Sequence, residues 1–312
     1  MVKEWKDGVG VTMVRNPNYW NPKAQHVDEI FYMVISNEPA RFKALQAGTV
    51  DVMYITRGYF GEIKKDANLK VITGPRGNAG FLVSFNNSKP PFNDLRVRKA
   101  LAHAIDRRAL TRVGGSEREP SNDWYGKGHP WECKNVKWPE YNPAKAKALL
   151  KDYGKPIKAV LNHFPVTHVG RSAEAVAVMW RKVGVQATAK KGGRGPAYLR
   201  PLLTGKFDLF TFVGGLTPDP ALVAAYYHSK HPSNKMFKIK DPKVDAALIK
   251  LGNARGKAAR HAASCEYQQL LVDQQRYIGW DVLSENVAYR THVKGVVRPF
   301  STVYDPHKYA VK

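Results

Sequence analysis

The amino-acid sequence predicts an α/β protein with about two domains. Its 312 residues are enough for two domains of ordinary size, and 43% of them are hydrophobic, which can cover a sizeable core. From Ile157 to Val213, β-rich runs alternate with apolar stripes of helical period. This alternation is typical of an α/β domain.

The net charge of +24 attracts phosphate groups and anionic membrane surfaces in general. Lys and Arg occur in nearly every segment, and the densest clusters are Arg107-Arg108, Lys190-Lys191 and Lys235 to Lys240. This spread favours a solvated basic surface over a nucleic-acid footprint.

The sequence has no run of about 18 apolar residues, and residues 1–8 lack the apolar core of a signal peptide.

Two cysteines, Cys133 and Cys265, exclude a disulfide-dense scaffold. They permit one bridge in an oxidising compartment. In the chain-entropy model this bridge would raise the free energy of unfolding by roughly 4–5 kcal/mol. The sequence leaves the pairing open. Two unpaired, mostly buried thiols are the interpretation we favour.

The sequence of the first part of the chain predicts strands that are joined by a short crossover helix. Ile30 to Ser36 and Val50 to Ile55 are β-rich runs. Between them a helix begins at Pro39 and ends at Gly48. Two strands joined in this way form a βαβ unit, so we expect them to be parallel with a right-handed crossover. A short helix near Tyr59 to Lys65 and the strand Leu69 to Thr73 follow.

The strand Phe81 to Phe85 precedes a helix that Asn93 or Asp94 caps. The helix carries an i, i+3, i+4, i+7, i+8 stripe made of Val97, Ala100, Leu101, Ala104 and Ile105. Residues 114–141 are rich in Gly, Pro, Trp and Asn and have little periodicity. We therefore expect a long surface loop there, anchored by Trp124, Trp131 and Trp138.

The second half of the chain begins with a helix from Asn142-Pro143 to Gly154. The elements expected next are the strand 157–162, a helix with Val176, Met179, Trp180 and Val183 on one face, the strand 185–189, the helix 196–203 and the strand 207–213. Two helices close this domain. One is capped by Asp241 and the other carries Tyr267, and β-like segments follow from Asn286.

One part of the sequence resembles a known signature. It runs Gly80-Phe81-Leu82-Val83-Ser84-Phe85-Asn86-Asn87, then Pro90-Pro91-Phe92-Asn93-Asp94-Leu95-Arg96-Val97-Arg98-Lys99-Ala100-Leu101, then Ala104-Ile105-Asp106-Arg107. Flanking landmarks follow the same order, namely Arg15 to Trp20, Ala44 to Gly48, Asn142 to Ala146, Phe207 to Leu209 and Pro218 to Pro220. The chain thereby resembles the family 5 extracellular solute-binding proteins, the dipeptide and oligopeptide receptors of ABC importers.

The resemblance implies a two-lobed α/β fold of the periplasmic-binding-protein kind, type II and cluster C-like. In that family the Arg15 to Trp20 motif lies well inside the protein, so the chain resembles a C-terminal portion with lobe I incomplete. Residues 1–84 would form part of lobe I, 85–280 lobe II, and 281–312 a return to lobe I. The hinges would lie near Phe85 to Asn87 and Ile278 to Glu285. Asp106 and Arg107 would maintain the geometry of lobe II.

The resemblance also implies where a ligand would bind. Peptide-binding members end a lobe-II strand with a tryptophan and, three residues later, an aspartate that pairs with the ligand's α-ammonium. Aligned on the Pro-Asp-Pro turn, these positions are Val213 and Leu216, and leucine cannot offset a buried ammonium. Asp219 is an anchor only in a shifted alignment, and an N-cap is its favoured role. The candidate ligand-binding residues are Phe85, Asn87, Val213, Gly215, Leu216 and Asp219.

On this resemblance we expect the substrate-binding component of an ABC importer, with a peptide or peptide-like solute as the leading ligand. It would close around the solute by hinge motion, act as a monomer, and have an ABC permease in the inner membrane as its partner. We expect a periplasmic location, no cofactor, no specific nucleic acid, and no catalytic or metal site. Two alternatives stay open: a ligand-sensing domain of a regulatory or nucleic-acid-associated protein, and a fragment that binds nothing.

Motifs for catalysis or metal binding give little support to other functions. No Gly-x-Ser-x-Gly elbow, His-Glu-x-x-His helix, Cys-x-x-Cys pair or Walker loop occurs. His228 and His231 have no carboxylate or cysteine close in sequence, which favours surface histidines over a metal site. Weaker metal candidates are His163, His168, and His129 with Cys133. Gly192 to Gly195 is expected to form a flexible turn rather than an anion cradle.

Overall fold

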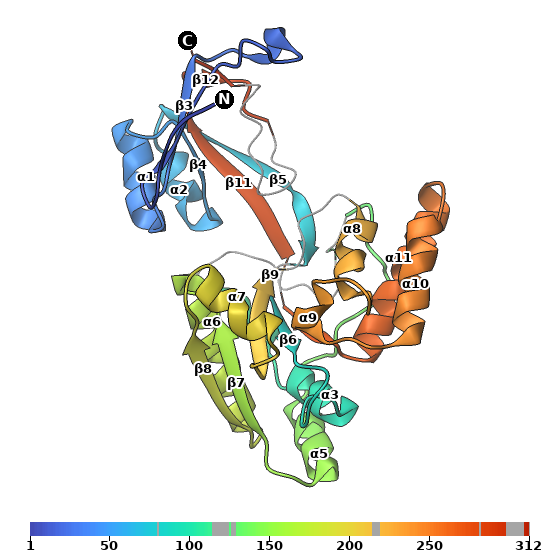
Figure 1. Ribbon diagram of the computed structural model, residues 1–312. Coiled ribbons are helices and arrows are strands. Elements are labelled where there is room, and N and C mark those ends of the chain that lie inside the picture. Colours follow the sequence, from blue (N-terminus) through green and yellow to red (C-terminus); the bar gives the residue numbers. More distant parts are fainter. Residues whose placement is uncertain are drawn as a thin grey trace. The chain divides into compact units, whose positions relative to one another are not determined.

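The chain forms two compact units, each with its own helices and strands (Figure 1). The computed structural model describes residues 1–79, 81–113, 125, 129–213, 219–280, 282–297 and 309–311. Unit 1 comprises Met1–Pro75 and Ser284–Lys312, and unit 2 comprises Arg76–Leu283. Among the described residues, no helix combines the length and the apolar composition that a bilayer crossing needs.

Unit 1 contains two three-stranded sheets. The first is an antiparallel meander of β1 (Val2–Lys6), β2 (Gly10–Val14) and β3 (Glu29–Met33). The second has the order β4-β11-β5, from β4 (Val52–Tyr54), β5 (Leu69–Ala79) and β11 (Val282–Arg290). A small core lies around α1 (Glu38–Ala47) and α2 (Phe60–Ile63), and its largest members include Phe42, Leu45 and Ile55. The remaining elements are η1 (Pro22–Ala24), η2 (Arg57–Tyr59), and the pair β12 (Val293–Lys294) and β13 (Ala310–Val311).

The predicted βαβ unit is wrong, because β3 and β4 belong to different sheets. The helix between them forms where predicted: the Asn37 side chain accepts a hydrogen bond from Ala40 N at 2.9 Å, and Gly48 ends the helix at φ 78°. β3 instead pairs with β2. At Gly10 of β2 a Cβ would lie 2.3 Å from Tyr32 O, so this pairing requires glycine. Periodicity locates strands, but it does not select their partners.

The centre of unit 2 is a five-stranded sheet with the order β10-β6-β9-β7-β8. The strands are β6 (Phe81–Phe85), β7 (Lys158–His163), β8 (Gln186–Lys191), β9 (Leu209–Val213) and β10 (Tyr277–Gly279). Its two faces bury two different cores. Trp180 of α6 (Thr167–Lys182) belongs to one core, and Tyr198 of α7 (Pro196–Leu203) belongs to the other. The alternation of strands and helices predicted between residues 157 and 213 is confirmed.

The other helices of unit 2 are α3 (Leu95–His103), α4 (Arg107–Val113), α5 (Pro143–Tyr153), α8 (Pro220–Ala224), α9 (Asn234–Phe237), α10 (Pro242–Asn253) and α11 (Lys257–Asp273), with η3 (Ala225–Tyr227) after α8. Asp94, Asn142 and Asp241 cap α3, α5 and α10 through their side chains, as predicted. The described residues 129–141 contain no helix or strand, in agreement with the predicted loop. Trp138 anchors this loop in the core, whereas Trp124 lies outside the described residues.

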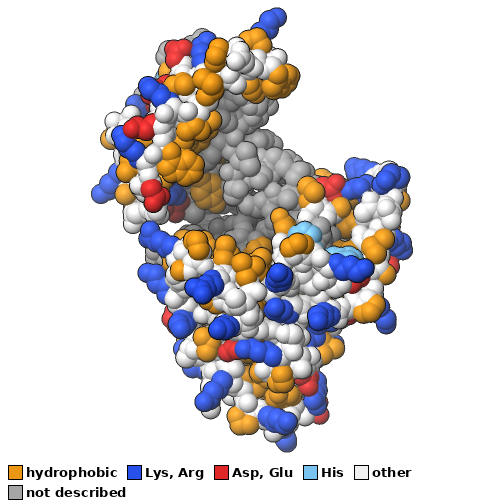
Figure 2. Space-filling view, viewed as in Figure 1, with side chains coloured by type: hydrophobic (Ala, Val, Ile, Leu, Met, Phe, Trp, Pro, Cys, Tyr) orange, Lys and Arg blue, Asp and Glu red, His pale blue; other side chains and the backbone are white. Residues whose placement is uncertain are grey.

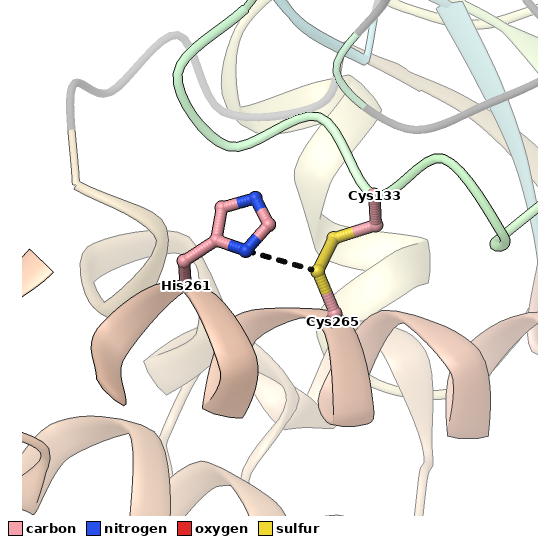
Figure 3. A group of neighbouring side chains, drawn as sticks. All are labelled: Cys133, His261 and Cys265. Carbon is pink, nitrogen blue, oxygen red and sulfur yellow. Dashed lines mark hydrogen bonds between the residues drawn. A yellow bond between two sulfur atoms is a disulfide. The ribbon is translucent and has the colours of Figure 1, made fainter. Parts of the chain in front are cut away.

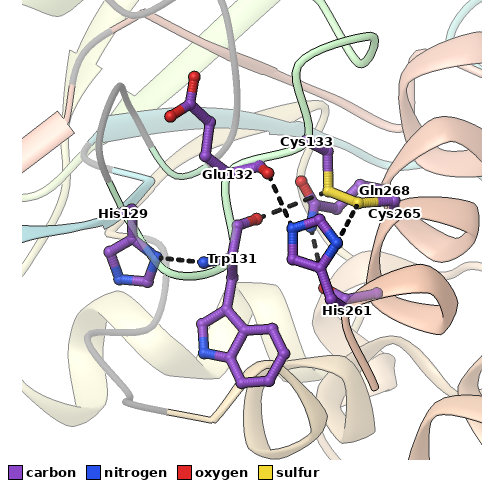
Figure 4. Close-up of a disulfide and its surroundings, with 8 residues drawn as sticks. His129, Trp131, Glu132, Cys133, His261, Cys265 and Gln268 are labelled. Atoms are coloured by element: carbon purple, nitrogen blue, oxygen red, sulfur yellow. Dashed lines mark hydrogen bonds between the residues drawn. A yellow bond between two sulfur atoms is a disulfide. The ribbon is translucent and has the colours of Figure 1, made fainter. Parts of the chain in front are cut away.

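The two cysteines are joined, so the favoured interpretation of two unpaired thiols is wrong (Figure 4). Cys133 of the loop and Cys265 of α11 form a disulfide with a Cα–Cα distance of 5.5 Å. They are 132 residues apart in sequence, and no local pattern encodes such a meeting. Trp131 of the same loop lies next to α11, because its ring stacks on His261 with a centroid separation of 6.3 Å. The disulfide therefore fixes the loop to a helix of the unit 2 core.

The division between the units differs from the expected lobe boundaries. The first crossing lies between residues 75 and 76, before β6, rather than after residue 84. β6 pairs along its whole length with β9, inside unit 2, so the boundary between the units lies before Phe85 to Asn87, and the hinge expected there stays a prediction. The second crossing lies between residues 283 and 284, inside the expected Ile278 to Glu285 segment.

Candidate ligand-binding site

The strands of unit 2 present their carboxyl ends at one edge of the sheet. β7 is parallel to β8 and β9, while β6 is antiparallel to β9 and to β10. The last residues of β7, β8, β9 and β10 therefore share an edge with the first residue of β6. In open α/β sheets, ligands bind at this edge. The chain also enters β6 and leaves β10 at this edge.

Phe164 is the aromatic residue that directly follows β7 at this edge. Its side chain is 45% exposed and contacts the Tyr198 ring edge to face, with 5.0 Å between the centroids. The Phe164 backbone N–H donates to Thr211 Oγ1 at 3.0 Å, and the Tyr198 hydroxyl donates to Thr211 O at 2.8 Å. Burial raises the pKa of Tyr198 to about 12, so it stays a neutral donor. These contacts hold an accessible aromatic surface in one position.

The turn after β8 packs tightly against the same residues. Gly192 N donates to His163 O at 2.9 Å. A Cβ at Gly192 would lie only 2.3 Å from Tyr198 Cδ2, so a larger residue would displace the tyrosine. The turn predicted at Gly192 to Gly195 is therefore present, and packing against Tyr198 explains its first glycine.

Two of the candidate residues lie at the opposite edge of the sheet. In the antiparallel pair of β6 and β9, Phe85 is opposite Leu209 and Phe81 is opposite Val213. Phe85 is buried in the core against Phe92. The buried Asn87 side chain donates to Phe85 O, Phe237 O and Arg276 O at 3.1, 2.9 and 3.4 Å. These contacts stabilise unit 2, and the structure does not bring Phe85 and Asn87 together with the other candidates.

Val213 ends β9 at the carboxyl edge, where its backbone pairs with Phe81. Gly215 and Leu216 lie outside the described residues, and so do residues 214–218 as a whole. The expected loss of the amine anchor at Val213 and Leu216 therefore stays a prediction from the sequence.

Asp219 is held by contacts within unit 2. Its Oδ1 accepts a hydrogen bond from Ala221 N at 2.9 Å, which caps α8 as the sequence favours. Its Oδ2 lies 2.6 Å from Arg260 Nη2, and Oδ1 contacts the same nitrogen. A carboxylate engaged by an arginine and a helix end is a weaker anchor for a ligand ammonium.

We predict that Asp219→Asn weakens ligand binding less than twofold, because Asn keeps the cap and loses the ion pair with Arg260. Asp219→Ala also loses the cap and should lower the free energy of unfolding by about 1 kcal/mol. Urea unfolding and calorimetric titration of both variants measure these effects. Arg260→Gln is the matched control, since it removes the ion pair and leaves the cap. A loss of binding in Asp219→Asn that Arg260→Gln does not share would instead show that Asp219 contacts the ligand.

The histidines proposed as surface residues, His228 and His231, have protein partners. His228 Nδ1 lies 3.9 Å from Asp245 Oδ1, and His231 contacts the Tyr226 ring. Of the described residues, one group combines several metal-binding types: Cys133, His261 and Cys265 (Figure 3). Its sulfurs form the disulfide, so they are not the thiolates that bind metals. The neighbouring His129 accepts a hydrogen bond from Trp131 N at 3.1 Å, and burial lowers its pKa to about 4.

The sequence reasoning did not name Phe164, Thr211 or Tyr198 as candidates, although the pattern contained a signal. The strand 157–162 was predicted inside an α/β alternation, and the residues after a parallel strand lie at the binding edge. Phe164 is the second residue after the predicted strand and directly follows the observed strand β7, which ends at His163.

Comparisons with known proteins agree with this fold. Residues 1–236 match the family model described as bacterial extracellular solute-binding proteins, family 5 middle. The periplasmic murein peptide-binding protein MppA of Escherichia coli (strain K12) is 27% identical over 281 residues, which cover 85% of this chain and 51% of that protein. The dipeptide-binding protein from Pseudoalteromonas sp. SM9913, solved in complex with Met-Leu, superposes with a TM-score of 0.88 at 19% identity, covering 100% of this chain and 64% of that one.

A second solved structure is that of AgaA from A. tumefaciens R10, which holds agropinic acid. It superposes with a TM-score of 0.87 at 20% identity, covering 100% of this chain and 66% of that one. The chain spans about a third to a half of the length of the curated relatives it matches. The fold, the signature and the family model agree over most of the sequence: this chain belongs to the bacterial extracellular solute-binding proteins of family 5.

Proposed function

We propose that this chain captures a small solute, with a peptide as the leading ligand, as the substrate-binding component of an ABC importer. The observation that carries this proposal is the carboxyl edge of the unit 2 sheet, where four strand ends meet a firmly held, half-exposed Phe164. Such an edge is the usual ligand position in α/β sheets. The relatives named as peptide-binding proteins support a peptide as ligand.

In this proposal the protein works outside the cytoplasm and releases its ligand to a permease in the inner membrane. The Cys133–Cys265 disulfide supports an oxidising compartment, since such bridges persist there. The crossings at residues 75/76 and 283/284 act as hinges, and the ligand shifts the equilibrium toward a closed state by binding that state more tightly. Binding and release account for the whole activity, with no chemical step.

Calorimetric titration with dipeptides and tripeptides tests the proposal. We expect Phe164→Ala to weaken binding at least tenfold, because it removes the aromatic contact surface. Ile249→Ala, on the exposed surface of α10, is the matched control and should change binding less than twofold. If no peptide binds, or if Phe164→Ala binds as tightly as the parent chain, the proposed peptide site at this edge is wrong.

The missing amine anchor gives a second expectation for the same assay. With Val213 and Leu216 at the anchor positions, the ligand's α-ammonium has no carboxylate partner there. N-acetylated and free dipeptides should therefore bind within about threefold of each other. A preference of a hundredfold or more for the free amine would show that another carboxylate serves as the anchor.

A further inference from the structure

We propose that unit 2 carries a binding surface for an anionic lipid bilayer, built on α7 and α9. These two helices pack against each other. Gly205, just after α7, lies next to Lys238, since a Cβ at Gly205 would be 3.3 Å from Lys238 Cε. We call this surface the α7–α9 face. We assign to it the two exposed leucines of α7 and five cations of α7, α9 and the residues next to them: Leu199, Leu203, Arg194, Arg200, Lys206, Lys235 and Lys238.

The α7–α9 face is basic because its segments contain no acidic residues. Between Glu174 and Asp208 the sequence has seven Lys and Arg and no Asp or Glu, and between Asp219 and Asp241 it has four Lys and again none. Within the described part of the chain, no carboxylate forms an ion pair with any of the five cations. Figure 2 shows the same excess of Lys and Arg over Asp and Glu on the visible surface of unit 2. Anionic headgroups complement such a surface.

Two exposed leucines indicate which kind of polyanion binds to the α7–α9 face. Leu199 and Leu203 are four residues apart, so they lie on the same side of α7, and they are 44% and 45% exposed. Tyr198 and Leu202 of the same helix are buried, so the leucines are not needed for the core. Aliphatic side chains surrounded by cations are typical of helices that lie in a membrane interface. A nucleic-acid backbone offers no apolar layer for them, and we therefore infer a lipid partner.

Co-sedimentation with lipid vesicles tests the proposal. One set of vesicles contains phosphatidylcholine alone, and in the other set about a third of the lipid is phosphatidylglycerol. We expect binding to the anionic vesicles only, and its loss at 1 M salt, where the Debye length falls to about 3 Å. Each cation near an anionic surface contributes roughly a fivefold factor in affinity. Arg194→Gln/Arg200→Gln/Lys206→Gln should therefore weaken binding at least tenfold. Leu199→Ser/Leu203→Ser should weaken it at least threefold.

Matched controls separate this face from the net charge of the chain. Lys145→Gln/Lys147→Gln/Lys151→Gln removes the same charge from the exposed side of α5 and should change binding less than twofold. Equal losses in the two triple variants would overturn the proposal, because net charge alone would then explain the attraction. Full binding by the double leucine variant, or tighter binding to a short DNA duplex than to the vesicles, would also overturn it. Far-ultraviolet circular dichroism confirms that each variant is folded, and none of the readouts depends on a peptide ligand.

Discussion

Replacing both cysteines by serine is expected to lower the free energy of unfolding of unit 2 by about 4–5 kcal/mol. The bridge joins residues 132 apart, and in the chain-entropy model its main effect is to restrict the unfolded chain. This change approaches half of the total stability of a typical domain. The measurement is urea unfolding of Cys133→Ser/Cys265→Ser, followed by tryptophan fluorescence, which reports on the buried Trp138, Trp180 and Trp280 of unit 2.

Reduction of the parent chain by a phosphine is the control for the serine substitutions. It should shift the unfolding midpoint as far as the double variant does, since both remove the same covalent link. The double variant itself should not respond to the reductant. Equal midpoints for the oxidised and reduced parent chain would show that the bridge does not stabilise unit 2.

Arg107→Ala is expected to lower the free energy of unfolding of unit 2 by about 3 kcal/mol. Arg107 Nε donates to Gly279 O at 2.8 Å, and Nη1 donates to Pro139 O at 2.6 Å. The side chain is buried, which lowers the pKa of its guanidinium to about 10. Removing it leaves two buried carbonyl groups without a donor, each at a cost of about 1–3 kcal/mol, while the desolvation penalty of the charge is relieved.

Arg108→Ala is the matched control, because Arg108 is the next residue of α4 and is exposed. It should change the free energy of unfolding by no more than about 0.5 kcal/mol. The comparison uses the same urea transition as the disulfide variants. Similar effects of Arg107→Ala and Arg108→Ala would show that the two carbonyl contacts contribute little.

The signature from Gly80 to Arg107 was informative about architecture, and its candidate ligand contacts stay a prediction. It located β6 and α3, and it predicted that Asp106 and Arg107 maintain the geometry of lobe II. The structure agrees: Asp106 Oδ1 accepts from Ala109 N at 3.0 Å, and Arg107 joins three segments. The same signature placed Phe85 and Asn87 among the ligand contacts. They lie at the end of β6 opposite to the carboxyl edge, a fact that only the register with β9 reveals.

Local chemistry determined a large part of the fold from the sequence alone. Caps at Asp94, Asn142 and Asp241, stops at Gly48 and Gly154, and apolar stripes such as that of α10 depend on residues within a few positions of each other. Propensity, capping and periodicity act over that range, so a single sequence contains them. The family resemblance added the two-lobed architecture.

Only the tertiary structure decided the contacts between distant segments. The Cys133–Cys265 bridge, the separation of β3 from β4 into different sheets, and the pairing of Asp219 with Arg260 all join residues that no local pattern relates. The same holds for the edge at which Phe164 meets Thr211 and Tyr198. The physical reason is that strand partners and ion pairs are selected by the packing of whole layers. The sequence by itself therefore determined the elements and the family, and the packing of unit 2 determined which distant residues meet at the carboxyl edge of its sheet.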